Sequence, residues 1–270
     1  MSDEPNTVRS VPTAAGVYDW LLGGHHHQPC DAEAAVRALQ AFPALGLAAR
    51  VNREFLHRTV RYLGSAGIRQ FLDIGSGYPA MGSVHEVAHA WAPRSRVAYV
   101  DHDPDTVAVS RELLAGTPDT IAIGGDLREP DAIFADPEVR AVLNFEQPVG
   151  LLLISVLPFL DGDAAELVAA FRARLAPGSH LVISHITESD DPIVRYQQQQ
   201  ATKSYNGTVR QQARTRTREE ITALFAGTEL VPPGLVHVPD WRPTNPRKHE
   251  PDDRDESRVV QLGGVGRVLG

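Results

Sequence analysis

Hydrophobic residues recur in two different patterns along this chain of 270 residues, and the pattern changes near Gly67. Before that point, apolar residues such as Val51, Phe55 and Val60 recur every three or four positions, which is typical of amphipathic helices. Asp31 is a candidate N-cap for the second of these helices. The predicted helices span residues 13–20, 32–42 and 45–63.

After Gly67, short apolar runs alternate with longer amphipathic stretches. The runs are apolar almost throughout, which indicates parallel strands covered on both faces of a sheet. The pattern therefore predicts a doubly wound α/β fold. The predicted strands are residues 70–74, 96–100, 120–123, 149–154 and 180–186, with short strands near Leu230 and at 259–262. The predicted helices are residues 81–92, 104–114, 131–135 and 164–175.

These patterns divide the chain into two predicted parts. Residues 1–65 form an N-terminal helical segment that could serve as a lid, and residues 66–270 form the α/β core. A helical insertion is expected around residues 190–226, and a loop rich in Pro and charged residues at 239–257.

The composition of the chain limits which partners and which cellular compartment we expect for the protein. A net charge of −8 argues against a nucleic-acid partner, and no apolar run is long enough to span a membrane. The basic cluster Arg210, Arg214, Arg216 and Arg218 is interpreted as a solvated helix face. Cys30 is the only cysteine and the first residues do not resemble a signal peptide, so we expect a cytoplasmic protein.

Candidate chemistry begins directly after the first predicted strand, at Asp73, Gly75, Ser76 and Gly77. The glycines allow a sharp turn and close approach of a ligand to the backbone, and the next helix presents free N–H groups. The same glycine spacing, with Ala80, also fits a dinucleotide-binding pattern. Asp73, however, suits a cationic amino group better than a pyrophosphate.

Two more acids follow the next two predicted strands. Asp101, followed by His102, can accept hydrogen bonds from ribose hydroxyls, as in NAD sites. Asp126, followed by Leu127, can accept a hydrogen bond from an adenine amino group. Three acids after three successive strands predict a pocket for a nucleoside joined to an amino acid.

At these residues the sequence resembles an actinobacterial family of S-adenosylmethionine-dependent methyltransferases that was once catalogued as a domain of unknown function. The resemblance covers nearly the whole chain. The matching stretches are residues 17–24, 50–56, 69–77, 84–88, 99–104, 176–179, 184–185, 241–243 and 263–267.

The resemblance implies the class I methyltransferase fold, a Rossmann-like, mostly parallel seven-stranded sheet with S-adenosylmethionine as cofactor and S-adenosylhomocysteine as product. Asp73, Gly75 and Gly77 would then hold the methionine part, Asp101 the ribose and Asp126 the adenine. Ser155, Tyr18 and Asp19 complete the predicted cofactor site.

Two stretches depart from the family pattern. His25, His26 and His27 replace a Lys-Asp-Asn-like segment, and Leu157-Pro158 replaces Leu-His after the fourth strand. Both stretches are expected near the acceptor, so the reaction or its substrate could differ from that of relatives. We predict no metal at the three histidines, because consecutive residues rarely converge on one ion.

The catalytic residues are less clearly indicated than the cofactor site. His185 is the main candidate for a general base, with His102 and Tyr205 as weaker ones, and Tyr18 could present its ring to the sulfonium. The leading hypothesis is methyl transfer to a small-molecule acceptor, for instance in secondary metabolism. The alternatives are transfer of another group or cyclisation of the cofactor, binding without catalysis, and an NAD-dependent oxidoreductase. A homodimer is one candidate assembly.

Overall fold

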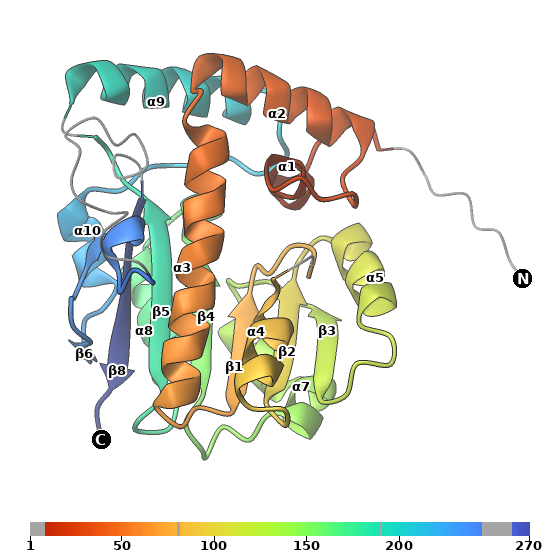
Figure 1. Ribbon diagram of the computed structural model, residues 1–270, viewed down its shortest axis with the longest axis vertical. Coiled ribbons are helices and arrows are strands. Elements are labelled where there is room, and N and C mark those ends of the chain that lie inside the picture. Colours follow the sequence, from red (N-terminus) through yellow and green to blue (C-terminus); the bar gives the residue numbers. More distant parts are fainter. Residues whose placement is uncertain (1–8, 80–81, 190, 245–260) are drawn as a thin grey trace, which may run out of the picture.

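The computed structural model describes residues 9–79, 82–189, 191–244 and 261–270 (Figure 1). Within this part of the chain, one sheet has the strand order β3-β2-β1-β4-β5-β8-β6, and β7 pairs with β8 as an eighth strand. Strands β1 to β5 are parallel, whereas β8 runs antiparallel to β5, β6 and β7. The strands are β1 (Gln70–Ile74), β2 (Arg96–Asp101), β3 (Thr120–Gly124), β4 (Gly150–Ile154), β5 (His180–Ile186), β6 (Thr228–Leu230), β7 (Val236–His237) and β8 (Gln261–Val268).

The sheet confirms the predicted mostly parallel, doubly wound architecture, and the five parallel strands match their predicted ranges to within one residue at each end. The two-residue strand β7 and the short helix α7 were not predicted, because neither is long enough to show a periodic pattern. The helices are α1 (Ala14–Leu21), α2 (Pro29–Ala41), α3 (Leu45–Ser65), α4 (Val84–Trp91), α5 (Pro104–Leu113), α6 (Pro130–Ala135), α7 (Pro137–Val142), α8 (Ala164–Arg172), α9 (Pro192–Asn206) and α10 (Arg218–Ala223), with 3₁₀ turns η1 (Leu157–Phe159) and η2 (Val238–Asp240).

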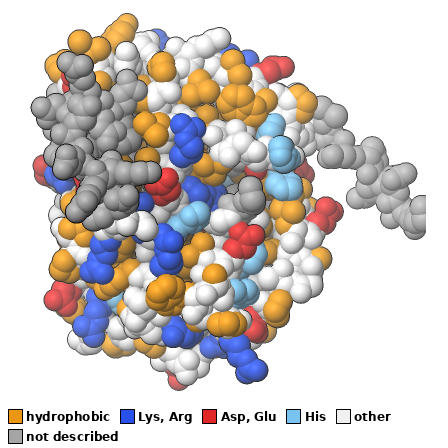
Figure 2. Space-filling model, viewed as in Figure 1, with side chains coloured by type: hydrophobic (Ala, Val, Ile, Leu, Met, Phe, Trp, Pro, Cys, Tyr) orange, Lys and Arg blue, Asp and Glu red, His pale blue; other side chains and the backbone are white. Residues whose placement is uncertain are grey.

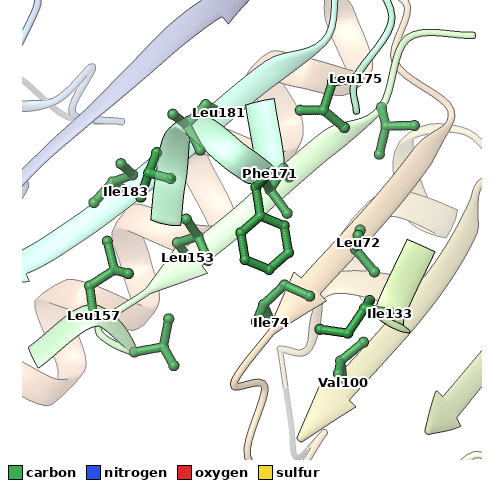
Figure 3. Close-up of a cluster of buried hydrophobic side chains, with 14 of the residues drawn as sticks. Leu72, Ile74, Val100, Ile133, Leu153, Leu157, Phe171, Leu175, Leu181 and Ile183 are labelled. Carbon is green, nitrogen blue, oxygen red and sulfur yellow. The ribbon is translucent and has the colours of Figure 1, made fainter. Parts of the chain in front are cut away.

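Helices cover both faces of the sheet, and each face has its own apolar core. On one face, Leu72, Ile74 and Leu153 pack against Ile133 of α6 and Phe171 of α8 (Figure 3). On the other face, α3 contributes a long buried stripe that packs on the sheet in a second core. Burial of strands on both faces is the physical reason why their sequences are apolar throughout.

A layer of helices lies across one end of the sheet. In Figure 1, α2 and α9 run side by side there, although about 150 residues separate them in the sequence. Val17 of α1 and Ala34 of α2 pack with Tyr205 of α9 and with Val209, which follows α9. Helix α3 begins in this layer and continues along the sheet, so it belongs to both. We call α1, α2 and α9 the helical layer.

Two local predictions were wrong. Helix α2 begins at Pro29 with Gln28 as N-cap, and Asp31 occupies the third position of a capping box. Arg210, Arg214 and Arg216 lie in the segment between α9 and α10 rather than on a helix, and Arg216 is buried. Ala80 and Met81, residues 259–260 of the last predicted strand, and most of the predicted loop at 239–257 lie outside the described residues. No helix in the described ranges is long and apolar enough to cross a membrane.

Candidate functional site

A cavity of about 690 Å³ lies at the carboxyl ends of the parallel strands. Its floor is formed by the segments that follow β1, β2, β3 and β4, and its roof by α1, α2, the start of α3, and α9. The strand order reverses between β1 and β4, which is where ligands bind in open α/β sheets. The cavity contains every residue predicted to bind the cofactor: Asp73, Gly75, Ser76, Gly77, Asp101, His102, Asp126, Leu127, Ser155, Tyr18 and Asp19.

The turn after β1 requires glycine at two positions. Gly75 and Gly77 have φ of 67° and 60°, in the left-handed region that residues with a side chain rarely adopt. At Gly75 a Cβ atom would also lie 2.1 Å from Cγ2 of Val156, which follows β4. The turn therefore brings the ends of β1 and β4 into contact and leaves the backbone open to the cavity.

Asp101 holds this turn in place from the end of β2. Its Oδ2 accepts a hydrogen bond from the backbone N–H of Gly77 at 2.9 Å, and its Oδ1 accepts one from that of Asp103 at 3.0 Å. Each carboxylate oxygen has a second lone pair. The side chain can therefore accept a further hydrogen bond from a ligand without releasing the turn.

Asp73 and Arg53 place opposite charges on the cavity wall. Burial raises the pKa of Asp73 to about 7, Arg53 opposes this rise and Asp101 adds to it. Asp73 is only 6% exposed at the cavity wall, and the buried Nε of Arg53 has no hydrogen-bond partner among the described residues. A buried carboxyl and an unpaired buried N–H are costly, and a ligand that carries both an ammonium and a carboxylate would satisfy them.

Asp126 and His102 lie at the ends of β3 and β2. Arg128 forms a bidentate pair with Asp126, and this hydrogen-bonded pair lowers the pKa of the Asp126 carboxyl. His102 contacts Gln211 of the segment after α9 at 3.1 Å, and its hydrogen bond with Asp101 raises its pKa. These residues connect the ends of β2 and β3 to the segment that follows α9.

Ser155, after β4, has a φ of 52°, which is unusual for a residue with a side chain. Its N–H donates to Oγ of Ser184 at 3.1 Å, and its Oγ accepts a hydrogen bond from Nε2 of Gln261 at 2.7 Å. Gln261 therefore joins β8 to the cavity, a position that the sequence analysis did not predict.

Tyr18 and Asp19 of α1 both line the roof but are engaged with neighbouring residues. The Tyr18 hydroxyl donates to the backbone oxygen of Ala49 at 3.2 Å, and Arg53 lies over the Tyr18 ring at 5.6 Å. Asp19 is buried, and its Oδ2 accepts hydrogen bonds from the backbone N–H groups of His26 and His27 at 2.9 and 3.0 Å. Asp19 thus fixes the three-histidine loop against the roof.

His185 does not line the cavity. Its Nε2 accepts a hydrogen bond from the buried Arg216 at 2.5 Å, and its Nδ1 donates to the backbone oxygen of Ile186 at 2.7 Å. Burial lowers the pKa of His185 to about 4, and Arg216 contributes to this decrease. Arg216 also donates to the carbonyls of Leu157 and Leu160, so His185 orients the arginine that anchors η1.

Tyr205 lines the cavity from α9. Burial raises the pKa of its hydroxyl well above the ordinary value, so it keeps its proton at neutral pH. Pro158, in the second departure from the family pattern, also faces the cavity, as expected.

Two cavity residues were missed in the sequence. Arg53 shares a helix face with Leu56 and Val60, and a charged residue in an apolar stripe could have been a signal. Gln261 had no comparable signal, because only the packing of β8 beside β5 brings it to the cavity.

The sheet order, the glycine turn and the acids after three strands define the class I S-adenosylmethionine-dependent methyltransferases. A family model described as S-adenosyl methyltransferase matches residues 2–269, and the chain belongs to that family. It is therefore a methyltransferase, and S-adenosylmethionine is its cofactor.

Two solved structures resemble the chain over nearly its whole length. A candidate methyltransferase from Thermobifida fusca YX is 36% identical, with 100% of both chains covered and a TM-score of 0.91. A DUF574 family protein from Streptomyces avermitilis MA-4680 is 35% identical, with 96% of this chain and 98% of the other covered and a TM-score of 0.87. No curated protein matches the chain.

Proposed function

We propose that this methyltransferase transfers the methyl group of S-adenosylmethionine to a small molecule enclosed beneath the helical layer. The observation that carries the proposal is the buried carboxyl of Asp73 at the strand-order reversal, together with the unpaired Nε of Arg53 in the same cavity. An amino acid joined to a nucleoside matches this pair together with the acids that follow β2 and β3.

Each part of the cofactor has a residue of fitting chemistry. Asp73 would bind the ammonium of the methionine part and Arg53 its carboxylate, with the turn at Gly75–Gly77 close to both. Asp101 would accept hydrogen bonds from the ribose hydroxyls and Asp126 one from the adenine amino group.

The bound cofactor supplies a methyl group on a positively charged sulfur, which a nucleophile can displace. The chain then has to position the acceptor and exclude water. Neither His185, which is turned away from the cavity, nor Tyr205, which keeps its proton, is suited to act as a base. We therefore assign no general base to either residue, and we assign Tyr18 to the shape of the roof.

The size of the cavity favours a small acceptor. Its volume of about 690 Å³ lies in the range of small-molecule sites, and much of its roof is apolar. On the face shown in Figure 2, basic and acidic side chains are interspersed and do not form one basic surface. This distribution supports a small molecule over a nucleic acid as the acceptor.

The test is calorimetric titration of wild type and three variants with S-adenosylhomocysteine, with 5′-methylthioadenosine, which lacks the amino-acid part, and with NAD. Asp101→Ala should weaken binding of both nucleosides by about 1–3 kcal/mol, because ribose hydroxyls lose their acceptor. Asp73→Asn and Arg53→Met should weaken S-adenosylhomocysteine alone, and NAD should not bind.

Asp105→Ala is the matched control, because Asp105 is an exposed acid four residues beyond Asp101. It should bind both nucleosides as wild type does. If Asp73→Asn and Arg53→Met weakened both nucleosides equally, our placement of the amino-acid part would be wrong.

A further inference from the structure

Gln261 lies on the side of the cavity away from Asp73, Asp101 and Asp126, although its hydrogen-bond partner Ser155 is a predicted cofactor residue. The acids assigned to the nucleoside and the methionine lie at the ends of β3, β2 and β1, whereas Gln261 begins β8. Between β1 and β8 lie β4 and β5, so three strand spacings, about 14 Å, separate Gln261 from Asp73 across the sheet. Gln261 is therefore placed where the cofactor site meets the space for the acceptor.

The side chain of Gln261 is held rigidly by one end of its amide. It is only 5% exposed, and its Nε2 donates to Oγ of Ser155 at 2.7 Å. Oγ of Ser155 is in turn 3.3 Å from Oγ of Ser184 on β5. This chain of polar groups fixes the amide plane at the wall of the cavity.

The other end of the amide has an unsatisfied acceptor. Oε1 of Gln261 is buried and forms no hydrogen bond with any described residue. A buried acceptor without a donor costs about 1–3 kcal/mol. A ligand that brings an O–H or N–H group to this atom recovers that cost, whereas a ligand without such a group does not.

The described side chains beside Gln261 are uncharged. Ile186 lies opposite Gln261 in the pairing of β5 with β8, Ile154 ends the neighbouring strand β4, and Ser155 and Ser184 are hydroxyls. A charged group placed here would lose its hydration without gaining a counter-ion. The matching donor is therefore a neutral one.

We propose that Oε1 of Gln261 accepts a hydrogen bond from the attacking group of the acceptor. The acceptor is then an uncharged, mainly apolar small molecule whose nucleophile is a hydroxyl or a neutral primary or secondary amine. This inference rests on the proposed function, and it excludes thioethers, tertiary amines and carbon nucleophiles as preferred acceptors.

The hydrogen bond also orients the nucleophile during transfer. A lone pair of its oxygen or nitrogen forms the new bond to the methyl carbon, and the carbon–sulfur bond breaks with its electron pair remaining on sulfur. The nucleophile then loses its proton to water, because the amide of Gln261 is not basic enough to take it up. Gln261 is thus a positioning residue that does not exchange protons.

The test compares compounds in which methyl groups replace the donor hydrogens. Protein saturated with S-adenosylhomocysteine is titrated calorimetrically with 4-propylphenol against 4-propylanisole, and with 4-propylaniline against its N,N-dimethyl derivative. Wild type should bind the donor-bearing member of each pair about tenfold more tightly, the lower end of the range for satisfying one buried acceptor.

Gln261→Met should abolish this preference, because its side chain is similar in size but has no oxygen. Gln261→Glu should retain it, since a carboxyl group that stays protonated at this buried position keeps a carbonyl acceptor and can donate its O–H to Ser155. Gln40→Met, on the exposed side of α2, is the control for the substitution itself and should behave as wild type does.

The affinity for S-adenosylhomocysteine should be unchanged in all variants, which separates this inference from the proposed function. Wild type that binds S-adenosylhomocysteine but does not favour either donor-bearing compound overturns the role of Gln261 alone. A preference that persists in Gln261→Met also overturns it. Failure of wild type to bind S-adenosylhomocysteine would instead contradict the proposed function.

Discussion

The floor and the roof of the cavity are built by different means. The floor consists of strand ends, where acids and glycines from neighbouring strands hold one another through backbone hydrogen bonds, as Asp101 holds Gly77. The roof is assembled from helices far apart in the sequence, which meet through small apolar clusters such as the one around Val17 and Tyr205. The difference indicates that the floor is specialised for one ligand of fixed chemistry and that the roof mainly determines the shape of the space above it.

The roof nevertheless depends on a few buried polar contacts. Asp31 is fully buried and accepts hydrogen bonds from Arg9 at 2.8 Å and from the backbone N–H of Thr13 at 2.8 Å. Asp19 similarly ties α1 to the histidine loop. These contacts fix the entry of the chain into α1 and α2, whereas the contacts of the floor also face the cavity.

The comparison predicts that the floor tolerates no added side chain at Gly75. Gly75→Ala should lower the affinity for S-adenosylhomocysteine about a hundredfold, since the new Cβ would strain the backbone and collide with Val156. Gly116→Ala is the control, because Gly116 also has a positive φ, of 82°, but has no atom within 4 Å of the added Cβ. Equal affinities in the two variants, measured by calorimetry, would contradict the role of this close contact.

Arg216 joins β5 to the turn η1, and its contribution to the stability of the fold can be measured. Arg216→Met should lower the free energy of unfolding by about 2 kcal/mol, because His185 Nε2 and the carbonyls of Leu157 and Leu160 lose their donor. Urea unfolding measures this change. Arg214→Met is the control at an exposed neighbouring arginine and should change stability by less than about 0.5 kcal/mol. Similar losses in the two variants would show that the buried contacts of Arg216 do not stabilise the fold.

The smallest expected effect is a pH dependence that arises from Asp73 in the floor. Its pKa of about 7 in the free protein lies above the ordinary value of 3.8, so the folded state retains a proton that the unfolded chain releases between these values. Stability of the free protein should therefore fall as pH rises from about 4 to about 7. Binding of an ammonium requires the ionised carboxylate, so the affinity for S-adenosylhomocysteine should rise about tenfold from pH 6 to pH 8.

Asp73→Asn removes the titrating group and is the reference for this measurement. Its affinity for S-adenosylhomocysteine should be lower than that of wild type and nearly constant over the same pH range. A wild-type affinity that does not change with pH would contradict the assignment of Asp73 to the ammonium.

Most of the floor could be predicted from the sequence. Asp73, Asp101 and Asp126 lie at or just beyond the carboxyl ends of apolar strands, and parallel strands bring these ends to one edge of the sheet. His185 also lies near the carboxyl end of a parallel strand, but its side chain does not line the cavity. Alternate residues of a strand point to opposite faces, and the side chain of His185 meets Arg216. The strand pattern identifies the edge of the sheet but does not reveal which neighbouring side chain will occupy a given face.

The sequence by itself determined the alternation of buried strands and helices, the glycine turn and the three acids, because these depend on local periodicity and on residues adjacent in the chain. Only the tertiary structure decided that α9 closes the cavity opened by α1 and α2, that Arg53 lines the same cavity as Asp73, and that Gln261 reaches Ser155. Gln261 and Ser155 are 106 positions apart, and about 150 residues separate α2 from α9. Such contacts form only when the whole sheet and its helices have packed, so no local pattern encodes them.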